Sequence, residues 1–265
     1  MADVIKHSSH GAIGALVIEP EGSIWQTDAN SMTCKQGTKA EERPKCTHAS
    51  ATVTQPNGDQ FREFVLLYQD DLSLQQHGVP MFNIRGGDDS EDSGQKAFNY
   101  RTEPIWARLG LKSPAAELEQ ANNRDFANVF SSVAHGDPET PIFRAHAGMP
   151  VRFRVVHPAG HPRQHAFALF GHDWQIQSWE CDSDSTVMGW NQYGANRVGT
   201  ISGIGPTKHH NILTTAGGDF HIIGDYMYRS QESFQFNGGL WGIFRVEDEG
   251  PWHDAIPGKR CPVKP

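Results

Sequence analysis

Two runs of alternating side chains, joined by a turn, constrain the fold of this chain more than any other feature. In PVRFRVV, residues 150–156, apolar side chains alternate with two arginines, and in HAFAL, residues 165–169, large side chains alternate with alanine. Pro158 and Pro162 break the pattern between the two runs. Because successive side chains of a β-strand point to opposite faces, this period of two predicts two strands joined by a turn.

The rest of the sequence favours an all-β protein. The chain has 27 glycines and 16 prolines, which suit frequent turns, and its β-branched and aromatic residues come in short runs. Its 265 residues can bury a substantial core, as one large or two small domains. The run FREFVLLY, residues 61–68, ends with apolar residues on both faces and predicts a central strand.

Charge and motifs argue against several classes of function. The formal net charge of −8 argues against nucleic acid as a partner, because phosphate binding needs a basic surface. No apolar run approaches the ~20 residues needed to cross a bilayer, so no membrane span is expected. The sequence shows no P-loop, no G-x-G-x-x-G after a strand and no Ser-His-Asp order, so nucleotide binding and hydrolase chemistry have no support.

The four cysteines give little information about metals. They lie at positions 34, 46, 181 and 261 and contain no C-x-x-C spacing for zinc. If all are oxidised, three pairings are open. Cys34 and Cys46 flank a loop rich in lysine and glutamate, and are the first candidates for a local disulfide.

The second alternating strand resembles the histidine strand of multicopper oxidases. In that family it reads approximately H-P-F-H-L-H-G-H: the first His serves a type 1 copper inside its own cupredoxin sandwich, and two later His face outward to a trinuclear copper cluster. The matching residues here are His165, Ala168 and Phe170. The resemblance implies a cupredoxin sandwich without the two outward ligands. Ala166, Ala168 and Phe170 are then expected to pack against another cupredoxin domain, or against a helix from within residues 78–140.

A second copper motif of the same family also lacks its ligands. In active members, the segment after G-x-Y-x-Y reads H-C-H-I-x-x-H-x-x-x-G-M/L. The matching run is RSQESFQFNGGL, residues 229–240, where Ser230 stands for the thiolate ligand and Gln235 for a histidine. A hydroxyl cannot replace the thiolate that holds type 1 copper. The surrounding frame is kept, at Gly224, Tyr226, Tyr228, Gly239, Leu240 and Gly242.

The N-terminal run GAIGALVIEP, residues 11–20, resembles the closing strand of a preceding cupredoxin domain. A strand needs neighbours to pair its backbone groups, and only ten residues come before this one. We therefore expect it to pair with another chain, or with the rest of a longer polypeptide, and to present Ile13, Leu16 and Ile18 at that interface. The alternative is an edge strand in this chain's own sheet.

The resemblance extends to particular members of the superfamily. Residues 98–110, FNYRTEPIWARLG, resemble a segment of large bacterial multicopper oxidases of the manganese-oxidase type. Residues 61–68 resemble the first strand of a cupredoxin domain in ceruloplasmin-like members. The chain is accordingly identified as a C-terminal portion of such a protein.

The predicted fold is an all-β, cupredoxin-like Greek-key β-sandwich with a long, partly helical insertion, plus the closing strand of a preceding domain. The expected segments are the end of a domain completed elsewhere, a linker, the cupredoxin-like domain with its insertion, and a C-terminal tail. The end of the preceding domain is expected at 1–25, the linker at 26–59, the cupredoxin-like domain at 60–248 with its insertion at 78–140, and the tail at 249–265.

Fourteen histidines leave a metal site within the chain open. His157, His161 and His165 surround the proline turn and could present three imidazoles, which are ligands for copper or zinc. Pro158 and Pro162 fix the turn in a shape that need not bring the rings together. Surface or hydrogen-bonded histidines are therefore the alternative.

The resemblance implies a non-catalytic portion or subunit of a multicopper-oxidase-type assembly. The family couples one-electron oxidation of a substrate, which can be a metal ion, to reduction of O2 to water. This chain would supply scaffold and interdomain interface, with copper held elsewhere in the assembly and none bound by the chain itself. An extracytoplasmic location is implied, although no signal peptide opens the sequence. The alternative is a stand-alone histidine-rich metal-binding or structural protein.

Overall fold

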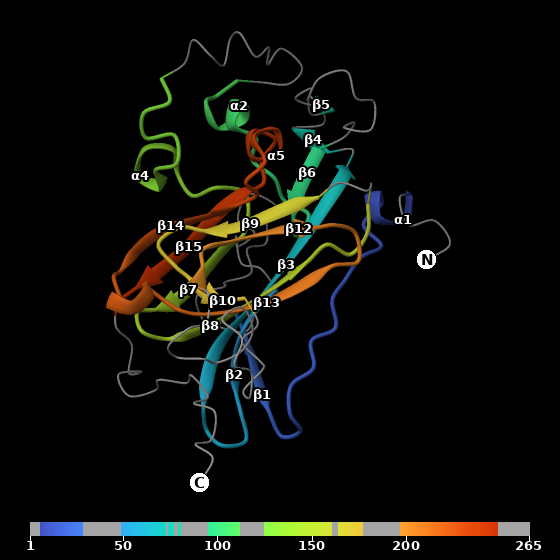
Figure 1. Cartoon of the computed structure of the whole chain (residues 1–265). Coiled ribbons are helices and arrows are strands. Elements are labelled where there is room, and N and C mark those ends of the chain that lie inside the picture. The colour runs from blue at the N-terminus through green and yellow to red at the C-terminus, as the bar shows by residue number, and fades with distance from the viewer. Residues whose placement is uncertain are drawn as a thin grey trace, which may run out of the picture.

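The described residues form two packed β-sheets in the computed structural model (Figure 1). The structure describes residues 6–28, 49–72, 74–76, 79–80, 95–111, 125–160, 164–176 and 197–248. The four cysteines, His161 and the predicted tail at 249–265 lie outside these residues.

The first sheet is built around the longest strand, β3. Its order is β1–β2–β3–β8–β13, and β6 pairs with the distal part of β3. β3 and β8 are parallel, whereas the other pairs are antiparallel. The strands are β1 Ile24–Thr27, β2 Ser50–Thr54, β3 Gln60–Leu72, β6 Gln95–Phe98, β8 Pro150–Val156 and β13 His209–Thr215.

The second sheet has the order β12–β9–β14–β15–β7. Its β15–β7 pair is parallel and the others are antiparallel. The strands are β7 Ile142–His146, β9 His165–Leu169, β12 Thr200–Ile204, β14 Gly224–Arg229 and β15 Trp241–Glu247.

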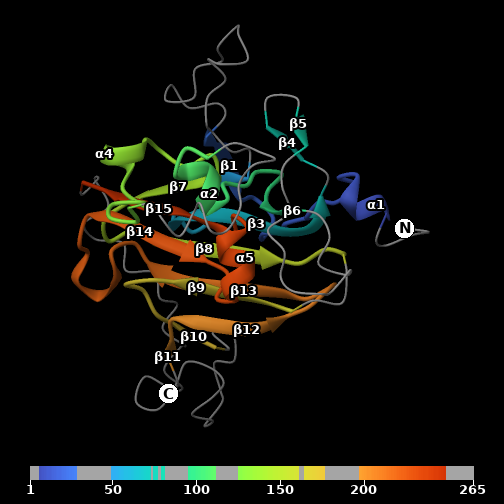
Figure 2. The same ribbon diagram turned by 90° about the horizontal axis from the view of Figure 1, so that it is seen from above.

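The remaining elements are short. Two small sheets pair β4 Gln75–Gln76 with β5 Val79–Pro80 and β10 Trp174–Gln175 with β11 Arg197–Val198. The helical elements are α1 Lys6–Ser9, α2 Ile105–Arg108, α4 Ser132–His135, η4 Gly218–Phe220 and α5 Ser233–Asn237. Seen from above, α5 lies close to β9 of the second sheet (Figure 2).

Aromatic side chains from both sheets meet in the core. Phe64 on β3 lies 4.8 Å from Phe143 on β7 and 5.9 Å from Phe244 on β15, measured between ring centroids. Phe153 on β8 lies 5.6 Å from Phe244 and 5.7 Å from Phe167 on β9. All five rings are fully buried. These contacts join the two sheets into a β-sandwich, which confirms the all-β sandwich predicted from the sequence.

The two strands predicted from alternation are β8 and β9, and they lie in different sheets. Val151, Phe153 and Val155 of β8 are buried and the residues between them are half-buried, as the alternation predicts. The chain crosses from one sheet to the other between the two strands. That crossing brings the residues on either side of the proline turn to the same end of the sandwich.

The sheet begins earlier than the predicted boundary at residue 60. β2 lies inside the range predicted as a linker, yet it pairs with β3 along its whole length. Its Ala51 and Val53 are buried, and Arg62 on β3 makes an ion pair of 2.7 Å with Asp28, just after β1. The short alternating run SATVT supplies this strand, so residues 50–54 form part of the first sheet although they fall within the range predicted as a linker.

The N-terminal segment 12–20 adopts neither helix nor strand in this chain. Figure 1 shows it running from α1 to β1 along one side of the first sheet. Glu19 anchors it by accepting hydrogen bonds from Arg152 at 2.5 Å and Arg154 at 2.6 Å. The structure thus holds this segment by side chains instead of a β-ladder, and its pairing with another polypeptide stays a prediction.

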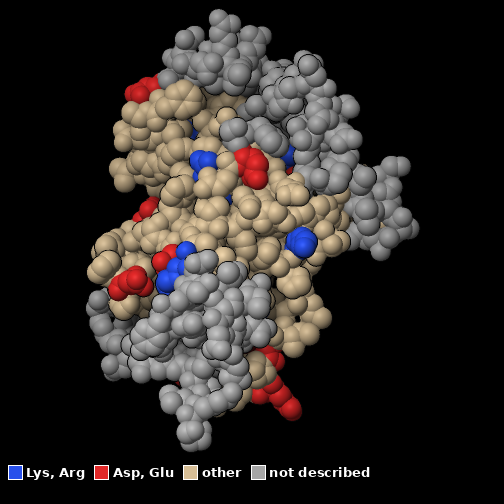
Figure 3. Space-filling view, in the orientation of Figure 1, with Lys and Arg blue, Asp and Glu red and all other residues tan. Residues whose placement is uncertain are grey.

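Charged side chains are sparse on the face drawn in Figure 3. Among the described residues in that view, blue and red side chains lie in small scattered groups and form no extended basic patch. Within the same part of the chain, no helix is long and apolar enough to span a membrane.

A buried histidine ties the end of β9 to the turn after β13. His172 accepts a hydrogen bond at Nε2 from the Gly217 N–H, at 3.0 Å, and its Nδ1 lies 3.1 Å from the Phe170 carbonyl oxygen. Burial lowers the pKa of His172, although the Phe170 carbonyl and Asp173 oppose this shift. The neutral ring is therefore the form that the fold accommodates.

The free energy of unfolding should fall with acidification, and part of this loss should depend on His172. A folded-state pKa below the unfolded value of about 6.5 means that the unfolded chain binds the proton first as pH falls. The stabilisation is present above about pH 6.5 and is lost below it, by at most about 1.4 kcal/mol per pH unit. Urea unfolding at about pH 7.5 and about pH 5.5 measures the loss. His172→Gln should flatten the difference, while the exposed His135→Gln should leave it unchanged; equal slopes in both variants would contradict the assignment.

Candidate functional site

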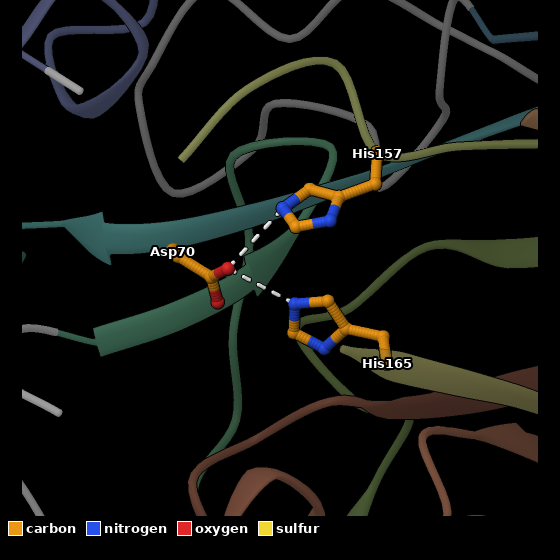
Figure 4. Close-up of side chains that lie close together, drawn as sticks. All are labelled: Asp70, His157 and His165. Atoms are coloured by element: carbon orange, nitrogen blue, oxygen red, sulfur yellow. Dashed lines mark hydrogen bonds and ion pairs between the residues drawn. The ribbon is translucent and has the colours of Figure 1, made fainter. Parts of the chain in front are cut away.

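Three ionisable side chains meet at one end of the sandwich interior (Figure 4). Asp70 comes from β3, His157 follows β8 directly and His165 opens β9. Asp70 is 2% exposed, and both histidines are fully buried. The site therefore lies between the two sheets, away from solvent.

Strand periodicity explains why these three side chains point inward. Asp70 continues the buried series Phe64, Leu66 and Tyr68, each two residues apart on β3. His157 continues the buried series of β8 in the same way, and His165 begins the series that leads to Phe167 and Leu169. The parallel register of β3 and β8 ends at Leu67 and Val156, which brings Asp70 and His157 side by side.

The carboxylate lies between the two imidazoles. Asp70 Oδ2 is 3.0 Å from His165 Nε2 and 3.2 Å from His157 Nε2. The contact with His165 has hydrogen-bond alignment, whereas His157 Nε2 makes no aligned hydrogen bond among the described residues. The two imidazole rings lie 4.7 Å apart at 80°, and the Tyr68 ring packs 4.7 Å from His165.

On the side away from Asp70, each imidazole faces a hydrogen-bond acceptor. His157 Nδ1 lies 3.2 Å from the Ile204 carbonyl oxygen, and His165 Nδ1 lies 2.6 Å from Gln235 Oε1. Gln235 Nε2 donates to the Gln164 carbonyl, which fixes Oε1 as the atom facing His165. In its neutral form, each ring therefore carries its proton on Nδ1.

The Asp70 carboxyl group is ionised in this setting. Burial alone would raise the pKa of Asp70, but His165, His157 and Lys96 together lower it well below its usual range. Lys96 Nζ lies 3.8 Å from the other carboxylate oxygen, Oδ1, and is itself buried. A negative charge is thus held inside the sandwich by cationic and hydrogen-bonding neighbours.

A second network adjoins the first at His165. The Ser230 hydroxyl lies 2.6 Å from Gln235 Oε1 and 2.6 Å from Glu232 Oε2. Ser230, Gln235 and His165 are all fully buried. The sequence comparison with the copper motifs matched these three positions to type 1 ligands, and the structure brings all three together.

Asp70 was not predicted from the sequence. The sequence does show that Asp70 shares its strand face with Phe64, Leu66 and Tyr68, the face that β3 turns to the core. His157 and His165 were predicted as candidates and do converge, while His161 lies outside the described residues. Asp70 takes the third place in the cluster.

The residues predicted at an interface differ in exposure. Ala166 and Ala168 are 3% and 2% exposed within this chain alone, so they add little to its surface. Phe170 is half-exposed at 48%, Leu16 and Ile18 are exposed, and Ile13 is half-buried. Their contact with another domain remains a prediction.

A groove of about 530 Å³ separates the N-terminal segment from the first sheet. Residues 12–18 line one side, and Arg154, His157 and His209 are among the residues on the other. The groove therefore reaches the surroundings of His157 from the outer face of the sheet.

Comparisons with known proteins give remote matches. No protein-family model and no curated protein matches the sequence. Among solved structures, the chain is similar to a multicopper oxidase, at 11% identity and a TM-score of 0.37, covering 77% of this chain and 58% of that one. It is also similar to a copper nitrite reductase from Nitrosomonas europaea, at 11% identity and a TM-score of 0.38, covering 70% and 48%. For a blue copper oxidase from the same organism the identity is 20%, the TM-score 0.31, and the coverage 44% and 36%.

This chain spans about half the length or less of two of these structures and 58% of the third. At these TM-scores the likeness is weak.

Proposed function

We propose that this chain is a cupredoxin-type domain in which a hydrogen-bonded network occupies the place of a type 1 copper, and that it serves as a non-catalytic scaffold in a multicopper-oxidase-type assembly. The observation that carries the proposal is the convergence of His165, Ser230 and Gln235 in one buried network. His165 comes from β9, and the other two come from the segment after β14.

The donor set at this position does not suit type 1 copper. It offers a hydroxyl, an amide oxygen and one imidazole, and it lacks the thiolate that binds and tunes the metal. The three groups also contact one another, at 2.6 Å from Gln235 Oε1 to both His165 Nδ1 and Ser230 Oγ. A copper ion could bind these groups only if their mutual hydrogen bonds were broken.

The buried core and the exposed apolar side chains of the sandwich support the scaffold role. Its described residues form a buried aromatic core, while the exposed apolar side chains Leu16, Ile18 and Phe170 offer contacts to a neighbouring cupredoxin domain. In the proposed assembly, copper and the oxidation of substrate belong to that neighbour. Co-purification of this chain with a copper-bearing chain would support the assembly directly.

Restoring two ligands should restore copper binding. The double variant Ser230→Cys with Gln235→His places a thiolate and a second imidazole beside His165, so Cu(II) should give the intense visible absorption of a copper–thiolate bond. Copper titration followed by visible absorption and by electron paramagnetic resonance measures the gain.

The single variant Gln235→His is the control, and it should remain colourless because it has no thiolate. The wild-type chain should show neither this absorption nor copper-dependent O2 uptake with a reducing substrate. A blue, catalytically active wild-type chain would refute the non-catalytic role.

A further inference from the structure

We infer that Asp70, His157 and His165 form a ligand set for a divalent ion of the zinc class, which they bind through one carboxylate oxygen and both imidazole Nε2 atoms (Figure 4). The site uses the nitrogen of His165 that faces away from Gln235. The zinc-site inference can therefore be tested independently of the function proposed above.

The hydrogen bonds behind the two histidines leave both Nε2 atoms facing Asp70. Because each Nδ1 faces an oxygen acceptor, a ring in its neutral form carries its proton there and turns the Nε2 lone pair toward Asp70. The carboxylate oxygen between them is also an acceptor. With both rings neutral, three acceptors would face one another inside the sandwich, so the arrangement requires a proton or a metal ion among them.

A proton satisfies this arrangement only in part. One imidazolium would donate to Asp70 from a single ring and leave the other Nε2 facing a carboxylate without a donor. Two imidazolium ions beside the buried Lys96 would place three cationic groups around one carboxylate. A single metal ion accepts electron pairs from both nitrogens and the oxygen at once.

The distances suit a small ion with nitrogen and oxygen ligands. Two ligand atoms that are each about 2.0–2.1 Å from a tetrahedral zinc ion lie about 3.3 Å apart. Asp70 Oδ2 lies 3.0 Å and 3.2 Å from the two Nε2 atoms, and all three atoms lie within 4.8 Å of one another. Small shifts of the side chains would admit the ion.

The groups behind the ligands are those that orient metal-bound histidines. A ligating imidazole usually donates its other N–H to a carbonyl or carboxylate oxygen, which fixes the ring and its tautomer. Here the Ile204 carbonyl does so for His157, and Gln235 does so for His165.

Gly160 leaves room beside the ligand atoms. A Cβ atom at this position would lie 3.4 Å from both Asp70 Oδ2 and His157 Nε2. Glycine therefore keeps open the side of the site from which a further ligand, such as water, would approach the ion.

The test is zinc binding by the full chain after treatment with a chelator and dialysis. Equilibrium dialysis with metal analysis should find one tightly held Zn²⁺ per chain, and Co²⁺ should give the visible spectrum of a low-symmetry site with nitrogen and oxygen ligands. Asp70→Asn and His157→Gln should each weaken this one equivalent about 100-fold, because a neutral amide is a far weaker zinc ligand than a carboxylate or an imidazole. His172→Gln, at a buried histidine outside the cluster, should retain it.

A wild-type chain without a tight equivalent, or an equivalent that survives in both site variants, would overturn the inference. Folding of the variants is checked by circular dichroism. If they fail to fold, ¹⁵N resonances of histidine in the wild-type chain decide: Zn²⁺ must shift two Nε2 resonances while their Nδ1–H protons persist. Unchanged Nε2 resonances at saturating Zn²⁺ would equally reject the site.

Discussion

Phe64→Ala is expected to lower the free energy of unfolding by about 3–5 kcal/mol, because it opens a cavity where the two sheets meet. The ring is fully buried on the central strand β3. It contacts Phe143 at 4.8 Å, Phe153 at 5.0 Å and Phe244 at 5.9 Å, and so joins three other strands. Urea unfolding followed by circular dichroism measures the loss, with the denaturant slope compared between variant and wild type.

Phe220→Ala is the matched control for this truncation. Phe220 is 85% exposed, so its removal should change the free energy of unfolding by no more than about 0.5 kcal/mol. Similar losses for the two variants would mean that Phe64 does not join the sheets as described.

Local alternation made part of the fold predictable. Residues 150–156 and 165–169 became β8 and β9, because a period of two is a property of each strand alone. The same periodicity correctly turned Val151, Phe153 and Phe167 to the core. It put His165 on the same face as Phe167, and the resemblance to the histidine strand implied that this face is the inner one.

The pairing of distant strands could not be obtained in this way. β3 pairs in parallel with β8, and β7 with β15, and each pair joins segments that are far apart in the sequence. Such registers depend on packing across the whole sandwich, and alternation within one strand does not specify them. β2 was missed for a related reason, because its five residues are too short to distinguish from a polar linker.

The candidate site was likewise predictable from the sequence only in part. His157 and His165 flank one turn, so their proximity was a reasonable prediction. Asp70 reaches them only because β3 lies beside β8 with one particular register. A carboxylate among buried aromatic and aliphatic residues was visible in the sequence, but its partners depended on tertiary structure.

Asp70→Ala should destabilise the chain by about 3–5 kcal/mol when measured in the presence of a chelator, as expected when one member of a buried charged group is removed. The change takes away the carboxylate that lies 3.0 Å and 3.2 Å from the two imidazoles and 3.8 Å from Lys96. Because the pKa of Asp70 is lowered in the folded chain, its charged form stabilises the fold above the unfolded value of about 3.9. Urea unfolding near neutral pH therefore reports the full loss.

Asp70→Asn separates charge from shape at the same position. The amide keeps the volume and can donate one hydrogen bond to an imidazole Nε2, but it offers no counter-charge to Lys96, so its cost should fall between those of wild type and Asp70→Ala. Asp173→Ala removes a carboxylate from a half-exposed ion pair with Arg197 and should cost no more than about 1 kcal/mol. If Asp70→Ala cost as little as Asp173→Ala, the buried cluster would contribute nothing to stability without metal, and the three side chains would be held in place by the surrounding core alone.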